Sequence, residues 1–408
     1  MKKILLFSLL FTCFDLTAQD HPTCDGLRYR TDVFADVEST KGLKYGEGTT
    51  INGTFKELYL DVYEPVGDLA ENRPAIVLAF GGSFIAGERS NLEWLCEAFA
   101  RKGFVAVTID YRLYDLPLFP LPTAEEMQIV VTKTISDMKA AIRFLREDAA
   151  TENQFRVDPD LVFAGGISAG AIVAAHTAAL DSTDTITPEL MDIISANGGF
   201  DGNTSSNFQY SSEVQGLINF SGGLNDAYWI DADDPPIFSV HDEFDGTVPY
   251  AEGFASIFGF NIIYMEGSGV MHEVADSVGV NNSLLTIVGS NSHVSYFNAN
   301  QAAGTLAQSA GFLHDLFCSP VSSVKGAVEK LSAVTVYPNP SAGQLFVKSE
   351  EAHDLLHLTL FNAIGQQTGS WENAATLDLS SCEAGVYFLK IEDRKTNAST
   401  MRKVLINR

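Results

Sequence analysis

Basic residues are scarce in this sequence. The 408 residues include 26 lysines and arginines against 52 aspartates and glutamates, which gives a formal net charge of −26. A nucleic-acid-binding surface needs a basic patch that neutralises phosphates, so the composition excludes nucleic acid as a partner. The acidic excess also disfavours anionic lipid surfaces and favours neutral substrates over strongly anionic ones. Hydrophobic residues still make up 46% of the chain, which is enough for a globular core.

Long hydrophobic runs are also missing. The apolar run at residues 4–11 follows Lys2 and Lys3 and leads into small or polar residues up to Ala18-Gln19. So short a run cannot span ~30 Å of hydrocarbon, and the pattern is typical of a secretory signal peptide, here residues 1–19. Lipidation at Cys13 is an alternative, but the residues before it fit a lipoprotein signal poorly. We therefore expect an exported protein with no transmembrane segment in the mature chain.

Cysteine is scarce as well. Four cysteines remain after residue 19, namely Cys24, Cys96, Cys318 and Cys382. An exported protein can form disulfides, and four cysteines allow three pairings. A Cys24–Cys318 bond would join the ends of the main domain, Cys24–Cys96 is the alternative, and the sequence does not decide between them. No Cys-x-x-Cys or Cys/His cluster has metal-ligand spacing, and we expect neither a metal nor a cofactor.

The last part of the chain, residues 331–408, differs in kind from the rest. Short segments of alternating apolar and polar residues are separated by Pro, Asn and Gly turns, which predicts a small all-β sandwich. Four features carry a closer resemblance: Tyr337-Pro338-Asn339-Pro340, residues 361–365, Gly385-Val386-Tyr387 and the basic-apolar residues 402–406. With these features the segment resembles the C-terminal sorting domain of the type IX secretion system of Bacteroidetes.

That resemblance implies the type IX secretion machinery as a partner and a location that is secreted or on the cell surface. A carbohydrate-binding β-sandwich is the alternative, but the segment shows no obvious aromatic platform. The acidic excess lies before residue 331, which supports a boundary there. We expect a catalytic domain at residues 20–320, a linker at 321–330 and the sorting domain at 331–408.

The main domain alternates strand-like and helical segments. Continuous apolar runs at residues 75–80, 104–109, 161–164, 217–220, 237–240 and 284–288 predict buried strands. Helical patterns at residues 134–150, 169–180 and 302–317 lie between or after them. This alternation predicts an α/β fold, with a mostly parallel sheet covered by helices on both faces.

The motif most suggestive of chemistry is Gly166-Ile167-Ser168-Ala169-Gly170. It follows a predicted strand and opens a predicted helix, which is the context that a nucleophile elbow requires. The glycines permit a tight turn, and the turn would place Ser168 above the sheet edge. The alternative is a plain strand-to-helix turn in which Ser168 only caps the helix.

A serine nucleophile needs a histidine base, which in this chain order follows an acid. His293 lies in a polar loop after a strand and before the last helix, so we predict it as the base. His272 is the alternative, although it opens a helical stretch. His176 lies inside the elbow helix, and His241 ends a strand.

The acid is expected in the loop after the strand at residues 237–240, where Asp242, Glu243 and Asp245 compete. We favour Asp245, at the far end of the loop before Gly-Thr-Val-Pro. Its role would be to orient the imidazole and to stabilise its charged form. Asp242 is closer to the strand end and would instead brace the loop.

A tetrahedral intermediate also needs N–H donors for its oxyanion. Ala169, the residue after the nucleophile, would supply one donor. Gly81, Gly82 and Ser83, after an early strand, would supply the others, because glycines let the backbone approach a substrate closely. A simple glycine turn is the alternative.

Together with Asp110-Tyr111-Arg112-Leu113 and Ser168-Ala169-Gly170, these features resemble the α/β-hydrolase carboxylesterases of the hormone-sensitive-lipase and feruloyl-esterase-like groups. The resemblance covers roughly residues 50–317 and implies a serine esterase. Phe80 stands where the family has a histidine that braces the oxyanion loop, and Ala171 replaces a common glycine. Because the backbone donors remain, we expect altered loop order or acyl preference and retained chemistry.

The sequence thus predicts a secreted serine carboxylesterase that acts on a small-molecule or polymer-borne ester. A serine peptidase with the same residues and a catalytically inactive surface protein of the same fold are the alternatives. Residues 114–123 form an apolar, proline-containing loop that would favour an acyl or aryl group. Residues 183–215 are long and polar and are interpreted as an insertion or lid. The natural ester, its acyl length and the oligomeric state are left open.

Overall fold

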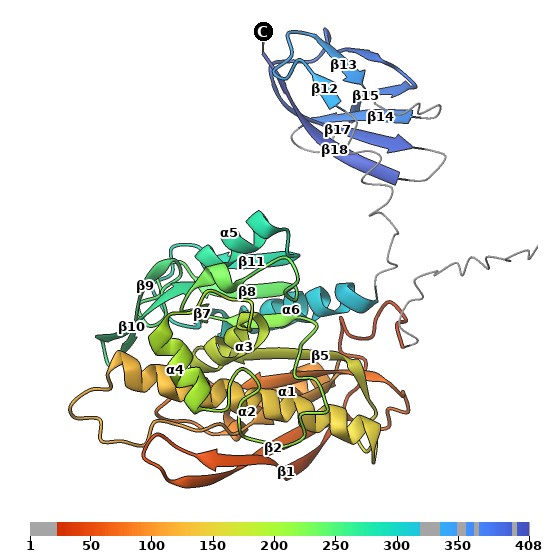
Figure 1. The fold of residues 1–408 in the computed structure, drawn as a ribbon. Coiled ribbons are helices and arrows are strands. Elements are labelled where there is room, and N and C mark those ends of the chain that lie inside the picture. Colours follow the sequence, from red (N-terminus) through yellow and green to blue (C-terminus); the bar gives the residue numbers. More distant parts are fainter. Residues whose placement is uncertain (1–22, 319–334, 349–355, 363–366, 394–397, 408) are drawn as a thin grey trace, which may run out of the picture. The chain divides into compact units, whose positions relative to one another are not determined.

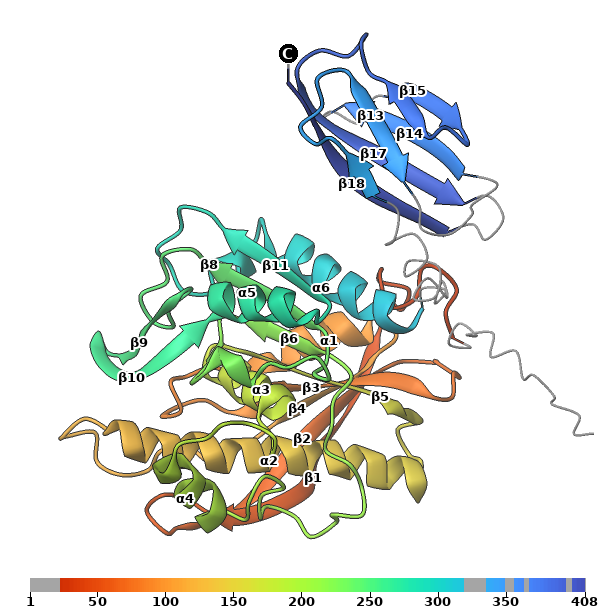
Figure 2. The ribbon, with the colours of Figure 1, turned by 45° about the horizontal axis from the view of Figure 1, so that its top comes forward.

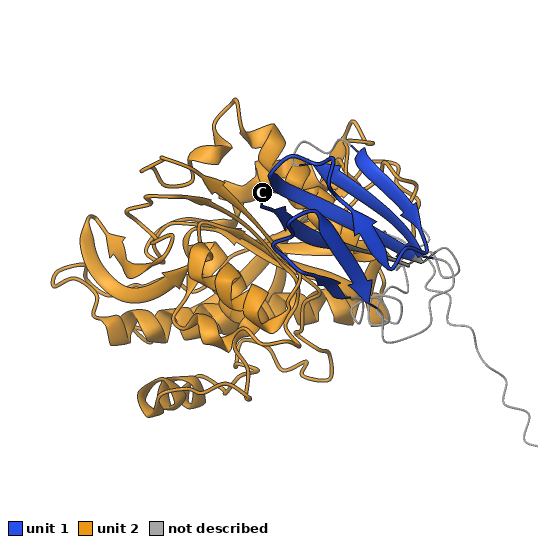
Figure 3. Cartoon of the chain, turned by 90° about the horizontal axis from the view of Figure 1, so that it is seen from above, with its two compact units in different colours: residues 1–20, 319–408 blue, residues 21–318 orange. Residues whose placement is uncertain are grey.

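The computed structural model describes residues 23–318, 335–348, 356–362, 367–393 and 398–407. It divides into two compact units, one spanning His21–Cys318 and one containing the residues from Ser319 to Arg408 (Figure 3). The expected signal peptide at residues 1–19 and the expected linker at 321–330 lie outside the described residues. Each unit is described by itself below.

The first unit is built on an eight-stranded sheet of order β1-β2-β4-β3-β5-β6-β8-β11 (Figure 1). The six strands from β4 to β11 are parallel, and β2 pairs antiparallel with both β1 and β4. The strands are β1 (Val37–Thr49), β2 (Phe55–Pro65), β3 (Arg73–Ala79), β4 (Val105–Ile109), β5 (Val157–Ile167), β6 (Leu217–Phe220), β8 (Ile237–Asp242) and β11 (Asn282–Ile287). Every residue of β3, β4 and β6 is buried, which explains why these strands were recognisable in the sequence as mostly apolar runs.

Helices cover both faces of this sheet, as predicted. The chain moves from β3 to β4 in one direction and returns past β3 to β5, and right-handed crossovers then place α1 opposite α2 and α3. The helix α6 packs beside α1, and α2 packs on α3. The helices are α1 (Glu93–Ala100), α2 (Ala124–Ala150), α3 (Ala169–Ala179), α4 (Pro188–Ala196), α5 (Ser268–Val278) and α6 (Ala302–Phe317). Short 3₁₀ turns lie at Arg89–Leu92, Ala227–Trp229 and Ser295–Phe297.

A separate three-stranded sheet stands beside the main one. It has the order β7-β10-β9, with β7 (Gly223–Leu224), β9 (Glu252–Ile257) and β10 (Phe260–Gly267) all antiparallel. The strands β9 and β10 form a hairpin that the sequence analysis did not anticipate. This hairpin lies in the connection between β8 and α5, so it belongs to the same edge of the sheet as the acid loop.

Residues 183–215, interpreted from the sequence as an insertion or lid, are bonded to α2 at Thr204. Thr204 Oγ1 donates to Asp137 Oδ1 at 2.6 Å and accepts from Arg112 Nη2 at 2.8 Å. Arg112 and Asp137 are both buried and form an ion pair at 2.7 Å. Buried charges need this kind of pairing, and here the pair ties the segment to the domain body.

A disulfide joins Cys24 to Cys318, with the two Cα atoms 5.5 Å apart. It connects the start of the first unit to the residue that follows α6, and it settles the pairing that the sequence left open. Among the described residues Cys96 and Cys382 are free and buried. Nearby, the Arg28 guanidinium pairs with Asp68 at 2.5 Å and further fixes the N-terminal segment.

The second unit consists of two small antiparallel sheets around its own apolar core. Their orders are β12-β13-β16 and β15-β14-β17-β18. The Tyr-Pro-Asn-Pro motif contacts the last strand. Its Asn339 side chain donates to the Lys403 carbonyl and accepts from the Leu405 amide, both at 2.8 Å. The strands are β12 (Thr335–Tyr337), β13 (Gln344–Lys348), β14 (Leu356–Asn362), β15 (Gln367–Glu372), β16 (Thr376–Asp378), β17 (Gly385–Asp393) and β18 (Ala398–Ile406).

Removing the disulfide should lower the stability of the first unit. We expect the double variant Cys24→Ser/Cys318→Ser to lose roughly 2–4 kcal/mol of unfolding free energy, because the cross-link restricts the unfolded chain. Denaturant unfolding of oxidised and reduced protein measures this. The wild type should lose a similar amount on reduction, and the double variant should not respond to reductant. An equal response of both proteins to reductant would contradict the assignment.

Candidate active site

Ser168 lies at a strained turn between β5 and α3. Its φ of 56° and ψ of −121° are unfavourable for a residue with a side chain, and strain of this kind gathers at functional sites. The flanking glycines are required by space, because a Cβ at Gly170 would overlap the Ala79 carbonyl and one at Gly166 would overlap Gly170. The Ser168 amide donates to the Phe220 carbonyl at 2.8 Å, which fixes the turn against β6.

The structure brings Ser168, His293 and Asp245 together in one hydrogen-bonded series. His293 Nε2 lies 2.8 Å from Ser168 Oγ, and His293 Nδ1 lies 2.6 Å from Asp245 Oδ2. These side chains come from the loops after β5, β8 and β11, which all end at the same edge of the parallel sheet. This arrangement can move a proton from the hydroxyl to the imidazole while a carboxylate stabilises the resulting cation.

The carboxylate of Asp245 is held in its ionised form. Burial alone would raise its pKa, but hydrogen bonds from His241 and His293 and the backbone amide of Thr247 outweigh this and lower the pKa to about 2. Asp245 Oδ1 accepts from the amides of Thr247 at 2.8 Å and Val248 at 3.2 Å. The side chain is therefore fixed on one oxygen and presents the other to His293.

The other two carboxylates of the acid loop hold the loop that carries His293. Asp242 accepts from the amide of Ser295 at 2.9 Å and from its hydroxyl, and Glu243 accepts from the Gly289 amide at 2.7 Å. This bracing by Asp242 is the role that the sequence analysis gave it. The base loop and the acid loop are therefore bound to each other on both sides of His293.

The remaining histidines are engaged elsewhere. His272 bonds with Ser239 at 2.8 Å and Asn282 at 2.7 Å, far along the sheet from Ser168, and His176 bonds with Asn225 at 2.9 Å. The sequence analysis gave no role to His241, which is fully buried next to Asp245. Its Nε2 lies 3.1 Å from the Val248 carbonyl and 3.5 Å from Asp245 Oδ2, and its Nδ1 lies 2.7 Å from Ser268 Oγ.

The predicted oxyanion residues lie around Ser168. A Cβ on Gly81 would be 3.1 Å from Ser168 Cβ, so this backbone passes directly beside the nucleophile. Gly82, Ser83 and Phe84 follow with φ values of 134°, 54° and 62°. Within the part of the chain that the structure describes, no protein acceptor is bonded to the amides of Gly82, Ser83 or Ala169. Amides without a protein acceptor are available to a developing negative charge.

Phe80, which replaces the family histidine, is buried and stacks on Tyr111 with ring centroids 4.2 Å apart. The Tyr111 hydroxyl donates to the Phe80 carbonyl at 2.6 Å. Gly87 packs on the Phe80 ring so closely that a Cβ there would overlap it. Aromatic packing and one hydrogen bond thus brace the loop from below, where the family resemblance implied a histidine.

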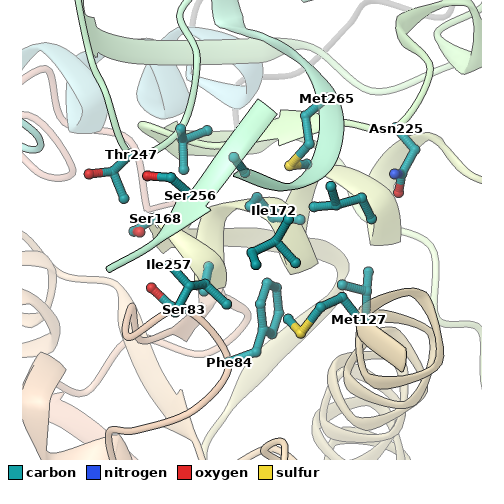
Figure 4. Close-up of a pocket in the computed structure, with 16 residues that line it drawn as sticks. Ser83, Phe84, Met127, Ser168, Ile172, Asn225, Thr247, Ser256, Ile257 and Met265 are labelled. Carbon is teal, nitrogen blue, oxygen red and sulfur yellow. The ribbon is translucent and has the colours of Figure 1, made fainter. Parts of the chain in front are cut away.

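Ser168 opens onto an apolar pocket of about 500 Å³, open mouth included (Figure 4). Its polar lining is limited to Ser83, Ser168, Asn225, Thr247 and Ser256, and among the described residues no charged side chain lines it. The loop at residues 114–123 does not line it, and Phe119 there is exposed to solvent. The apolar lining comes from Phe84, Met127, Val131, Ala169, Ile172, Val248, Ala255, Ile257, Ile262, Ile263 and Met265.

Comparison with known families gives two matches that do not overlap. Residues 60–225 match the BD-FAE family, and residues 335–407 match the secretion system C-terminal sorting domain. Residues 60–225 are thus similar to an esterase-like α/β-hydrolase family, and residues 335–407 are similar to a secretion sorting domain. The predicted resemblance and the predicted fold class are both confirmed, and the sorting domain directs the protein to the cell surface or the outside by type IX secretion.

Individual proteins are similar to parts of this chain. Esterase 2 of Thermogutta terrifontis, phosphoramylated by tabun, is 23% identical with a TM-score of 0.50, over 70% of this chain and 96% of the esterase. Its native form is 24% identical with a TM-score of 0.48, over 72% and 98%. The neuroligin-like protein glit-1 of Caenorhabditis elegans is 30% identical over 118 residues, 28% of this chain. The matched stretch is only 15% of that curated relative, and the similarity to the esterase concerns the fold alone.

Two features are absent from the described residues. These residues contain no cluster of three or more His, Cys, Asp or Glu side chains placed to hold a metal ion. No helix among them combines the length and the apolar character needed to cross a membrane.

Asp245→Asn should lower the stability of the fold in a pH-dependent way. The pKa of Asp245 is depressed to about 2 from 3.8, so its stabilisation is present above pH 3.8 and is lost as pH falls towards 2. We expect the variant to be about 2 kcal/mol less stable than the wild type at pH 7, with the difference shrinking between pH 4 and pH 2. Denaturant unfolding at several pH values measures it. Glu152→Gln, at an exposed site, is the control, and a pH-independent difference would contradict the prediction.

Proposed function

We propose that this chain is a serine carboxylesterase that hydrolyses neutral carboxylic esters through an acyl-enzyme on Ser168. The observation that carries the proposal is the series Ser168–His293–Asp245 at the end of an uncharged apolar pocket. The BD-FAE match and the esterase-like fold support the hydrolase chemistry, and the sorting domain supports its use outside the cell. We further propose that residues 1–19 are removed on export and that residues 20–320 form the catalytic domain.

In the first half of the reaction Ser168 Oγ attacks the ester carbonyl while His293 Nε2 takes the hydroxyl proton. The imidazolium is stabilised by Asp245, which stays ionised. The carbonyl oxygen becomes an oxyanion and accepts hydrogen bonds from the Ala169 amide and from amides of the Gly82–Ser83 loop. His293 then gives its proton to the alcohol oxygen, the C–O bond breaks, and the alcohol leaves.

In the second half a water molecule attacks the acyl carbon. His293 takes one proton of the water, and the same amides stabilise the second oxyanion. The bond to Ser168 Oγ then breaks, His293 returns the proton to Oγ, and the carboxylic acid leaves. No atom beyond the ester and water is consumed, and the serine is regenerated.

Replacing the nucleophile tests the proposal directly. We expect Ser168→Ala to lower kcat for p-nitrophenyl butyrate by ~10⁴-fold, because no other group in the series can form the acyl-enzyme. A fluorophosphonate probe should label the wild type and leave the variant unlabelled. Support for such labelling comes from the similar esterase that carries an organophosphorus adduct.

Two outcomes would favour the alternative functions, a peptidase or an inactive surface protein. If amide substrates are tested beside the esters, amide hydrolysis at a rate comparable to that of esters would favour a peptidase. Wild-type protein that neither turns over esters nor reacts with the probe would favour an inactive surface protein. Equal rates for wild type and Ser168→Ala would show that the hydrolysis takes place elsewhere.

A negative charge on the acyl group should make an ester a poor substrate. Residues 157–324 contain no lysine or arginine, and no charged side chain among the described residues lines the pocket. A carboxylate on the acyl group would lose its hydration there without gaining a partner. We expect p-nitrophenyl hemisuccinate to have a kcat/KM at least ~10-fold below that of p-nitrophenyl butyrate. Added salt screens the repulsion between the substrate and distant carboxylates, so it should reduce this difference in kcat/KM only in part. Equal kcat/KM values for the two esters would contradict the prediction.

A further inference from the structure

The β9–β10 hairpin contributes to the wall of the pocket and also carries an exposed tip. Side chains from both of its strands, namely Ile257, Ile262 and Met265, line the pocket. Its tip projects from the side of the first unit, as Figure 2 shows. There Phe258 and Phe260 expose 74% and 58% of their surface. One element therefore connects the pocket to an exposed apolar tip.

The tip is unusual because Phe258 has a backbone conformation that disfavours a bulky side chain. Phe258 and Gly259 both have positive φ, 52° and 81°. Glycine tolerates this region, but a bulky side chain disfavours it, and hairpin turns of this kind prefer Asn-Gly. The Phe258 ring also stays in water, so neither the local backbone nor burial accounts for a phenylalanine here. A strained and exposed apolar residue suggests a contact made outside the chain.

The exposed rings continue the surface of the pocket. Phe260 is the direct cross-strand partner of Ile257, and directly opposed side chains of an antiparallel pair lie on the same face. Ile257 is buried and lines the pocket beside Phe84, as Figure 4 shows. The apolar surface thus runs from the pocket past Ile257 to Phe260 and Phe258 without a charged residue between them.

The electrostatics of this region restrict what can cover the tip. Between Arg156 and Lys325 the chain has no lysine or arginine, and this stretch contains Ser168, Asp245, His293 and the whole hairpin. Glu252 and Glu266 lie on the hairpin itself. An anionic lipid surface or an acidic polymer would find no cation on this stretch of the chain and would be repelled by its carboxylates. A neutral apolar surface meets neither obstacle.

From these observations we infer that the tip of the hairpin, Phe258 with Phe260, docks the enzyme onto the surface of an aggregated, uncharged ester phase. The rings enter the apolar surface, and Ile257, which directly precedes Phe258 and lines the pocket, contacts an ester that passes from that surface towards Ser168. This inference rests on the proposed esterase function for its substrate, but the docking step itself needs no catalysis. It can therefore be measured separately.

The experiment uses emulsified tributyrin and the full chain. Adsorption is measured by centrifugal flotation with Ser168→Ala, so that the droplets are not consumed. Turnover is measured with the active protein below and above the solubility limit. We expect flotation of the protein with the droplets and a rise in rate above the limit that a saturation curve from dissolved ester does not predict.

Phe258→Asn is the decisive variant, because Asn-Gly suits the turn and should preserve or improve the hairpin. It should lower adsorption about tenfold, as loss of one buried aromatic ring implies, and lower the ratio of emulsion to dissolved rates similarly. Phe260→Ser should act in the same direction. The control is Leu69→Asn, which removes an 85% exposed apolar side chain before β3, at the opposite end of the parallel strands.

The outcomes separate docking from catalysis. A wild type that does not float and shows no excess rate on the emulsion overturns docking, even when dissolved esters are hydrolysed. Unchanged adsorption of Phe258→Asn overturns it too, as does a dimer that this variant dissociates, because the tip would then bind a second copy. Droplet binding without ester hydrolysis would instead overturn the proposed function and leave docking intact.

Discussion

The close approach of the Ser168 turn to the end of β3 is the constraint on which the rest of the site depends. Gly166 and Gly170 let the start of α3 lie against the carbonyls of β3, and Gly81 passes beside the Ser168 side chain in return. A side chain at any of these glycines would separate the nucleophile from the loop of free amides. The strained φ of Ser168 and the positive φ of Gly82 and Ser83 are both consequences of this packing.

The fold and the local motifs could be predicted because their signals are local. Buried parallel strands read as apolar runs, and the turn at Ser168 has its glycines within two residues. The Asp245 and His293 positions followed from chain order, since the loops after β8 and β11 end at the same sheet edge. Asp242 could be assigned a bracing role for the same reason, because it ends its strand.

What could not be predicted depends on contacts between distant segments. The hairpin was missed because Phe258-Gly259 lacks the usual turn signature, although an apolar-polar alternation around a glycine was present. Residues 183–215 were interpreted as an insertion or lid because they are long and polar, and the contact of Thr204 with the buried Arg112–Asp137 pair left no signal in the sequence. Cys24 and Cys318 are 294 residues apart, and spacing over that distance carries no information about pairing.

The uneven distribution of lysine and arginine in the first unit explains why the loop at Gly82 and Ser83 has to be rigid. In α2 the buried cations serve the structure: Lys139, Arg143 and Arg146 bond backbone carbonyls of residues 200, 201 and 211, and burial lowers the pKa of Lys139 to about 8. No charged side chain among the described residues lines the pocket into which Ser168 opens, so no cation there is placed to stabilise a developing oxyanion. In the proposed reaction its stabilisation then falls to the backbone amides and the N-terminus of α3. Amides stabilise an oxyanion only at short range and in the right orientation. The stacking of Phe80 on Tyr111 fixes the loop that carries them. In the proposed reaction this rigidity matters more than it would if a cation lay close to the oxyanion.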